Sequence, residues 1–114
     1  MPTQTITRKP LLKTLLGNRT VNAVDVREIR FEPSQQTGRH LHPCPVLSYI
    51  VEGTATIQIE GQPAQTLPAG SAFHEPAQTV MARFDNASDS DPMTFIAFYL
   101  LDGDQDLITM LDPA

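Results

Sequence analysis

The sequence has little of what stabilises small secreted proteins or binds nucleic acids. It contains a single cysteine, Cys44, so a disulfide within the chain is excluded. Eight lysines and arginines are outnumbered by thirteen aspartates and glutamates, which gives a net charge of −5. Because no basic run is present, neither a nucleic acid nor a membrane is an expected partner. The single cysteine gives no sign of an oxidising compartment, and we predict a cytoplasmic protein.

Long hydrophobic runs are also missing. No apolar stretch approaches the roughly 20 residues that a membrane-spanning helix needs. The stretch KPLLKTLLGN, residues 9–18, is apolar but short, and Lys13 interrupts it. We interpret it as a short helix or an ordered arm and not as a signal peptide. The prediction is therefore an N-terminal arm over residues 1–20, followed by one domain over residues 21–114.

The chain does contain many short β-type segments. Ten prolines and six glycines interrupt it at short intervals, which favours short strands over helices. Residues 46–51 carry apolar side chains on both faces, and residues 54–60 alternate between apolar and polar. In residues 21–33 the alternation shifts by one between Val26 and Ile29, which predicts a β-bulge. The whole pattern predicts roughly seven or eight strands in an all-β sandwich or barrel.

Two of the three histidines lie one residue apart in GRHLHPCP, residues 38–45. On an extended segment, His40 and His42 point to the same side about 6.5 Å apart along the chain, so both imidazoles can contact one cation. Two imidazoles alone make a weak site, since tight divalent sites have three or more protein ligands. Val46 lies on the same face further along, but its side chain cannot bind a metal.

This stretch resembles the first sequence motif of the small cupins. That motif is a glycine, five residues, H-x-H, three or four residues, a glutamate, six residues and a glycine. His40 and His42 occupy the two histidine positions, and Gly53 occupies the closing glycine position. Ser34 stands in place of the first glycine, and Val46 stands in place of the glutamate.

The second cupin motif has weaker counterparts here. Gly70 and Pro76 have the separation of its first glycine and its proline. Gln78 replaces the second glycine, Met81 stands in the histidine position, and Asn86 follows close to the place of the family asparagine. The resemblance covers residues 21–101 and implies an all-β double-stranded β-helix, or jelly-roll cupin barrel, with a short N-terminal arm or helix. It also implies a homodimer in which the arm crosses to the partner.

Metal-binding cupins generally present three histidines and one glutamate, of which this chain keeps two histidines. Glu75 could complete a two-histidine, one-carboxylate set for iron, manganese or zinc. Met81, with or without Cys44, would favour copper instead, and waters or a substrate could also complete the ligand set. His74 and Glu75 point to opposite faces of a strand, and the resemblance favours Glu75 inside. We expect either no metal or one divalent transition metal (Fe, Mn, Ni, Zn or Cu) bound by His40, His42, Glu75 and Met81.

A substrate pocket for a small-molecule ligand is predicted beside these residues, formed by Cys44, Val46, Tyr49 and Arg83. Structural roles stay open for the same side chains: an inert Cys44, an apolar lining by Met81, a core Tyr49 and a solvated Arg83.

Three functions stay open as well. The first is a metal-dependent enzyme on a small molecule, such as a dioxygenase, isomerase or decarboxylase. The second is a metal-free binding or sensing protein, nearly level with the first. The third is a sugar-nucleotide epimerase, which would use His40 or His42 as a base oriented by a carboxylate, and Tyr49 or Tyr99 as the acid.

Overall fold

The computed structural model describes residues 4–113, so Met1–Thr3 of the predicted arm and Ala114 of the predicted domain lie outside the described residues. No helix in the described part is long and apolar enough to cross a membrane. The strands in this part follow one another as β1 (Ala23–Phe31), β2 (His40–Leu41), β3 (Val46–Glu52), β4 (Thr54–Ile59), β5 (Gln65–Pro68), β6 (Ala72–Glu75), β7 (Met81–Asn86), β8 (Met93–Leu101) and β9 (Thr109–Met110).

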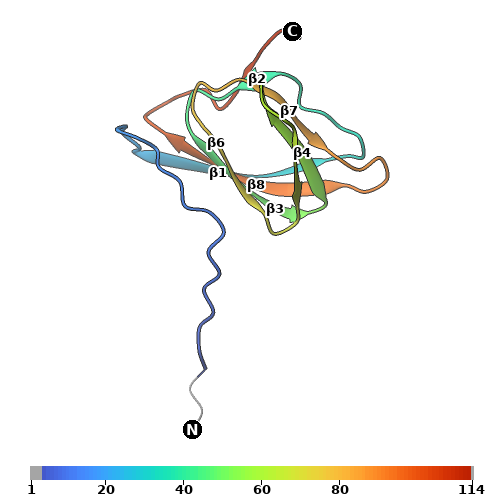
Figure 1. The fold of residues 1–114 in the computed structure, drawn as a ribbon. Helices are drawn as coiled ribbons and strands as arrows, with labels where there is room; N and C mark the ends of the chain where they lie inside the picture. The colour runs from blue at the N-terminus through green and yellow to red at the C-terminus, as the bar shows by residue number, and fades with distance from the viewer. Residues whose placement is uncertain (1–3, 114) are drawn as a thin grey trace.

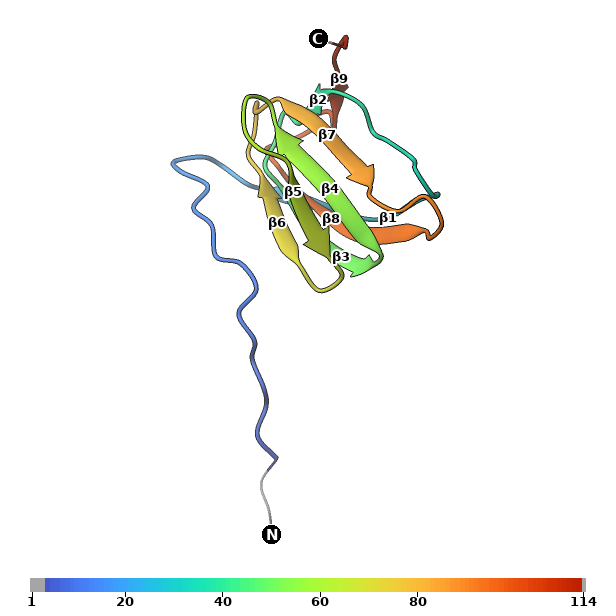
Figure 2. The same cartoon turned by 45° about the vertical axis from the view of Figure 1, so that its right-hand side comes forward.

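The strands form two antiparallel sheets that enclose the interior of a barrel (Figure 1). The first sheet has the order β1-β8-β3-β6, and the second has the order β5-β4-β7-β2-β9. Figure 2 shows β5, β4 and β7 of the second sheet side by side. The predicted all-β jelly-roll architecture is confirmed. The strand count exceeds the prediction because β2 and β9, with two residues each, are too short to leave a pattern in the sequence.

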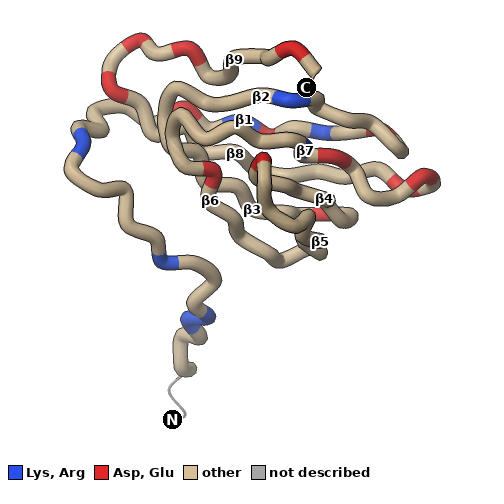
Figure 3. Tube along the Cα trace, turned by 45° about the horizontal axis from the view of Figure 1, so that its top comes forward, with Lys and Arg blue, Asp and Glu red and all other residues tan. Residues whose placement is uncertain are grey.

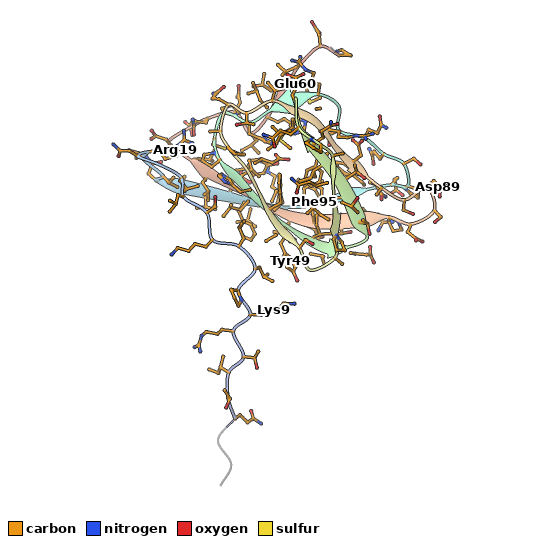
Figure 4. The ribbon with its side chains drawn as sticks, viewed as in Figure 1. Lys9, Arg19, Tyr49, Glu60, Asp89 and Phe95 are labelled. Atoms are coloured by element: carbon orange, nitrogen blue, oxygen red, sulfur yellow. The ribbon has the colours of Figure 1, made fainter. Side chains whose placement is uncertain are left out.

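Alternation along the central strands decides which side chains form the core. Val46, Ser48 and Ile50 of β3 are buried, whereas Leu47 and Tyr49 between them face away from the interior. At one end of the barrel, the Phe95 ring packs against two other phenylalanine rings, with centroid separations of 5.6 Å to Phe31 and 4.8 Å to Phe84. Figure 4 shows Phe95 inside the barrel. Burying each such side chain contributes about 1.5–3 kcal/mol, so this cluster is a main part of the apolar core.

Strand β1 departs from the sequence-based prediction. It pairs with β8 in one continuous register from Ala23 to Phe31, so the predicted bulge between Val26 and Ile29 is wrong. Val24 and Val26 are instead exposed on the outer face, each at 55%. Since the register is unbroken, Ile29 and Phe31 face inward together with every second residue before them.

Gly53 makes the corner where the chain passes from β3 in the first sheet to β4 in the second. Its φ of 82° lies in the left-handed region that glycine adopts without strain. A Cβ atom here would come within 2.6 Å of the Pro92 carbonyl oxygen. The residue is therefore required both by the backbone conformation and by the close approach of the neighbouring loop.

The described part of the predicted arm, residues 4–20, has no helix. Residues 4–22 contain neither helix nor strand. Their N-terminal part leads away from the barrel (Figure 1), whereas Thr14 contacts His74 on the barrel surface. Pro10 and Gly17 restrict a helix here to the few residues between them, which is too short for a stable isolated helix. Four of the eight basic residues lie in the arm, whereas the acidic residues lie on the barrel (Figure 3).

Candidate metal centre

Three potential ligands meet inside the barrel. His40 lies in β2, His42 follows directly after it, and Glu75 is the last residue of β6. Each is at most 5% exposed. One ligand atom from each lies within 4.8 Å of the other two, a spacing that suits a single metal ion.

Backbone carbonyl groups orient both imidazoles. The Nδ1 atom of His40 lies 2.8 Å from the Gly38 carbonyl oxygen, and that of His42 lies 2.7 Å from the Leu107 carbonyl oxygen. Because a carbonyl only accepts hydrogen bonds, Nδ1 carries the proton in each ring. Nε2 of each neutral ring therefore keeps a lone pair for a ligand, the arrangement that metal-bound histidines use.

Both Nε2 atoms face the Glu75 carboxylate. The distance from Oε2 to His40 Nε2 is 3.9 Å, and the same oxygen contacts His42 Nε2 directly. Burial tends to raise the pKa of Glu75, but the two histidines outweigh this effect and hold it below its usual value. Burial likewise lowers the pKa of His40, yet Glu75 and the Gly38 carbonyl raise it overall. The cluster therefore favours a carboxylate beside a positive charge, which either a proton or a metal ion can supply.

The register of β3 with β6 explains how Glu75 reaches this place. Val46 lies directly opposite Glu75, so both side chains are on the interior face. The carboxylate thus enters from the strand beside the position where the cupin motif has its glutamate. His74 points the other way, and its Nδ1 lies 2.8 Å from Thr14 Oγ1 of the arm.

Met81 and Cys44 are both completely buried, but neither lines the cavity beside the histidines. Met81 pairs with His40 in the register of β2 and β7, which puts its side chain on the interior face. Burial raises the pKa of the Cys44 thiol, so it stays protonated at neutral pH and is not a thiolate ligand. Cys44 packs in the hydrophobic core instead of in the predicted pocket.

A cavity of about 200 Å³ opens beside the three potential ligands. Its walls are mostly apolar, with hydroxyl groups from Thr37, Ser48 and Tyr99. The Tyr99 ring packs edge-on against His42 at a centroid separation of 5.9 Å. The other lining residues are Ile29, Phe31, His40, His42, Val46, Glu75, Phe84, Phe95, Ala97 and Ile108.

Of the four predicted pocket residues, only Val46 lines this cavity. Tyr49 lies on the outer face of β3, on the side of the arm (Figure 4), because its position alternates with that of Val46. Arg83 also points outward, where its Nε donates to Asp85 Oδ2 at 2.9 Å. The pairing of β4 with β7 shifts between Arg83 and Met81, and this bulge explains why Arg83 faces outward although Met81, two residues earlier, faces inward.

Sequence reasoning gave no pocket role to Ser48 or Thr37, and it named Tyr99 only as a possible acid. Residues 93–101 are apolar on both faces, so the sequence does not tell which face is interior. The register of β8 with β3 decides this, because it sets Tyr99 beside Val46 and Ala97 beside Ser48. The small side chains of Ala97 and Ser48 leave the room that the cavity occupies.

Comparison with protein families gives a match over residues 27–101 to the family described as "Cupin domain". No curated protein sequence matches the chain. Similar solved structures include a cupin-like protein from Thermotoga maritima, with a TM-score of 0.65 and 22% identity over 79% of this chain and 65% of that chain. A DMSP lyase from Ruegeria pomeroyi has a TM-score of 0.65 and 17% identity over 76% of this chain and 42% of that chain.

A third similar structure is an oxalate oxidase in complex with the substrate analogue glycolate. It has a TM-score of 0.62 and 17% identity over 77% of this chain and 46% of that chain. The chain therefore spans less than two thirds of the length of each of these proteins. At such low identities the likeness shows the fold alone.

Proposed function

This chain belongs to the cupin family, as its motifs predicted, and on that premise we propose that it is a metal-dependent enzyme acting on a small molecule. The observation that carries the proposal is the buried cluster of His40, His42 and Glu75, whose ligand atoms lie within 4.8 Å of one another. Buried ionisable groups are costly unless they are paired or bind a metal, so their convergence beside a cavity points to a functional site.

The donor set suits a divalent transition ion. Two imidazoles and one carboxylate form the facial set that iron, manganese and zinc accept, and it leaves coordination positions open. A bound ion would supply polarisation of a carbonyl oxygen or activation of dioxygen. Met81 stays a candidate for a further ligand, since its thioether shares the interior face with His40.

The surrounding residues perform the tasks that such a reaction needs. The backbone carbonyls hold both histidines in one tautomer, and Glu75 contributes a negative charge that offsets the charge of a cation. Burial, followed by the proximity of Glu75, raises the pKa of Tyr99, so its hydroxyl stays protonated and can donate a hydrogen bond to a substrate oxygen. The apolar walls exclude water from the reacting atoms.

A metal-free binding or sensing protein is the second candidate. It is favoured by Val46 and Met81, which replace two of the four family ligands with side chains that do not bind hard cations. An epimerase receives less support. Tyr99 and Glu75 both lie beside His42, as such an enzyme would need, but Glu75 contacts Nε2, the nitrogen that would have to accept the substrate proton, because Nδ1 donates to Leu107.

We also propose a homodimer in which the arm of each chain packs on the partner. Ile6 and Leu15 of the arm are 70% and 86% exposed, and Val24 and Val26 are exposed on the outer face of the first sheet. Residues 1–20 hold four basic residues and no acidic one, which leaves a net charge of −9 on residues 21–114. Apolar surface and opposite charge therefore complement each other between the two parts of the chain.

The proposed enzyme is tested by comparing turnover in wild type and in His42→Gln. Each chelator-treated protein is loaded with Fe²⁺, Mn²⁺ or Zn²⁺ and incubated with a metabolite library, and consumption is followed by mass spectrometry. We expect at least one compound to be consumed only by loaded wild type. His74→Gln is the matched control, because His74 faces outward, and it should keep the activity. Compounds that bind metal-free protein but are never consumed would support the binding protein instead.

A further inference from the structure

The interior face of β1 carries a charged pair beside the cavity. In the register of β1 with β8, Arg27 lies opposite Ala97 and Asp25 lies opposite Tyr99. Side chains at directly paired positions share one face of a sheet. Since Ala97 and Tyr99 line the cavity, Arg27 and Asp25 stand on the cavity's side of the sheet.

Along this face the strand changes from charged to apolar. Ile29 and Phe31, the next residues with the same orientation, line the cavity. Strand β1 is an edge strand of its sheet, and the Arg27 side chain is 57% exposed. Neither Arg27 nor Asp25 lines the cavity itself. The guanidinium group stands in contact with solvent on the same face of β1, next along the strand from the apolar wall that begins at Ile29.

Among the basic residues of the described barrel, Arg27 alone has this orientation. Four of the eight lysines and arginines belong to the arm. Arg30 points to the outer face of β1, because Ile29 and Phe31 on either side of it point inward. Arg39 and Arg83 point outward as well, where each is paired with a carboxylate.

Arg27 already holds a carboxylate in a two-point contact. Its Nε donates to Asp25 Oδ1 at 2.9 Å, and its Nη2 donates to Asp25 Oδ2 at 3.3 Å. This fork is the geometry in which arginine recognises carboxylate ligands. An exposed ion pair of this kind contributes little to stability, so a ligand carboxylate can replace Asp25 at small cost.

We propose that the protein binds a small carboxylic acid as its anion, with the carboxylate on Arg27 in place of Asp25 and the remaining atoms in the cavity beside Tyr99. This inference rests on the proposed function, because it names the substrate class of the same site. The cavity of about 200 Å³ has the volume of roughly six or seven liquid water molecules, which limits the acid to a small one. Its apolar walls select a hydrocarbon or aromatic body.

The test uses butyrate and its neutral analogue butyramide as probes. Binding to the zinc-loaded and the metal-free full-length protein is measured by ligand-observed NMR. Wild type should bind butyrate at least about tenfold more tightly than butyramide, and Arg27→Gln should lose this preference. The matched control is Arg30→Gln, since Arg30 lies on the same strand, is 55% exposed and is paired with Glu32, but faces outward. It should leave butyrate binding unchanged.

A second variant tests the competition with Asp25. Asp25→Asn removes the internal carboxylate without removing Arg27, so butyrate should bind several-fold more tightly than to wild type. Equal effects of the Arg27 and Arg30 variants, or no butyrate binding by wild type in either form, would overturn the inference. If zinc is not retained but binding of butyrate depends on Arg27, the proposed enzyme fails and the carboxylate specificity stands. If zinc is retained but Arg27→Gln binds butyrate as tightly as wild type, the carboxylate specificity fails and the proposed metal site stands.

Discussion

At the scale of single residues, the site depends on which side chains lie opposite one another across neighbouring strands. Glu75 and Val46 are cross-strand neighbours on the interior face. A carboxylate from β6 can therefore serve where the cupin motif expects one from β3. Met81 has the same relation to His40. The proposed ligand set thus differs from the family pattern in sequence while keeping the potential donor atoms in one place.

Restoring the family glutamate tests this relation. Val46→Glu adds a second buried carboxylate beside Glu75, so metal-free protein should lose about 3–5 kcal/mol of its free energy of unfolding. With Mn²⁺ or Zn²⁺ the additional ligand should tighten metal binding. Urea unfolding with and without metal measures both effects. Val46→Gln, of similar size but uncharged, is the control. A Val46→Glu protein that resembles it in both respects would contradict the proposed arrangement.

The titration of the cluster gives a pH dependence with a definite sign. The pKa of His40 is raised above 6.5, so its contribution to stability is complete below that pH and is lost as pH rises through the folded-state pKa. The pKa of Glu75 is lowered below 4.5, so its contribution is present above that pH and is lost as pH falls through the folded-state pKa. Metal-free protein should gain most from the cluster between pH 4.5 and 6.5.

Urea unfolding of wild type and Glu75→Gln in chelator, from about pH 4 to about pH 9, measures this contribution. This range covers the ordinary pKa values of carboxyl and imidazole groups. The comparison is needed because burial lowers the pKa of His74, which gives stability the opposite slope near neutral pH. The difference in stability between the two proteins should shrink as pH rises above 6.5. A difference that grows with pH would show that His40 and Glu75 do not stabilise one another.

At the scale of elements, the corner between β3 and β4 sets the two sheets against each other. Gly53→Ala should place a Cβ 2.6 Å from the Pro92 carbonyl oxygen. Gly61 has nearly the same φ, 83° against 82°, but a Cβ added there would meet nothing within 4 Å. Gly61→Ala should therefore cost only the backbone strain of about 1–2 kcal/mol, and Gly53→Ala a further 1–3 kcal/mol. Thermal unfolding of both variants measures the costs, and equal costs would argue against close packing at the corner.

Much of the fold could be predicted from the sequence because its signals are local. The alternation of residues 54–60 indicated the inner face of β4, where Ala55 and Ile57 are buried, and the H-x-H spacing brought His40 and His42 together. Residues 46–51, apolar on both faces, did not tell that Tyr49 faces outward. Arg83 and Arg27 show where this fails. The orientation of Arg83 depends on a bulge formed against β4, and that of Arg27 on pairing with a strand about 70 residues away. Such relations between distant strands leave no trace in either segment alone.

At the scale of the whole molecule, charge separates the arm from the barrel. The arm is basic, and residues 21–114 carry a net charge of −9. The arm of one chain should therefore attract the barrel of another, whereas two arms, or two barrels, should repel each other. If arm exchange holds a homodimer together, deletion of residues 1–20 should yield a folded monomer, and the dimer of the full chain should weaken in high salt. Sedimentation velocity at two salt concentrations measures both. A full-length monomer, or a dimer that survives the deletion, would contradict arm exchange.

The measurement that bears most directly on the central claim is the metal content of protein purified without a tag or chelator. Elemental analysis should find one transition-metal ion per chain in wild type and in His74→Gln, whose altered residue faces outward. His42→Gln should have lost it, since His42 Nε2 faces the Glu75 carboxylate at the centre of the cluster. If iron, manganese, nickel, copper and zinc all fail to bind wild type, or bind His42→Gln equally well, then His40, His42 and Glu75 are not a metal centre.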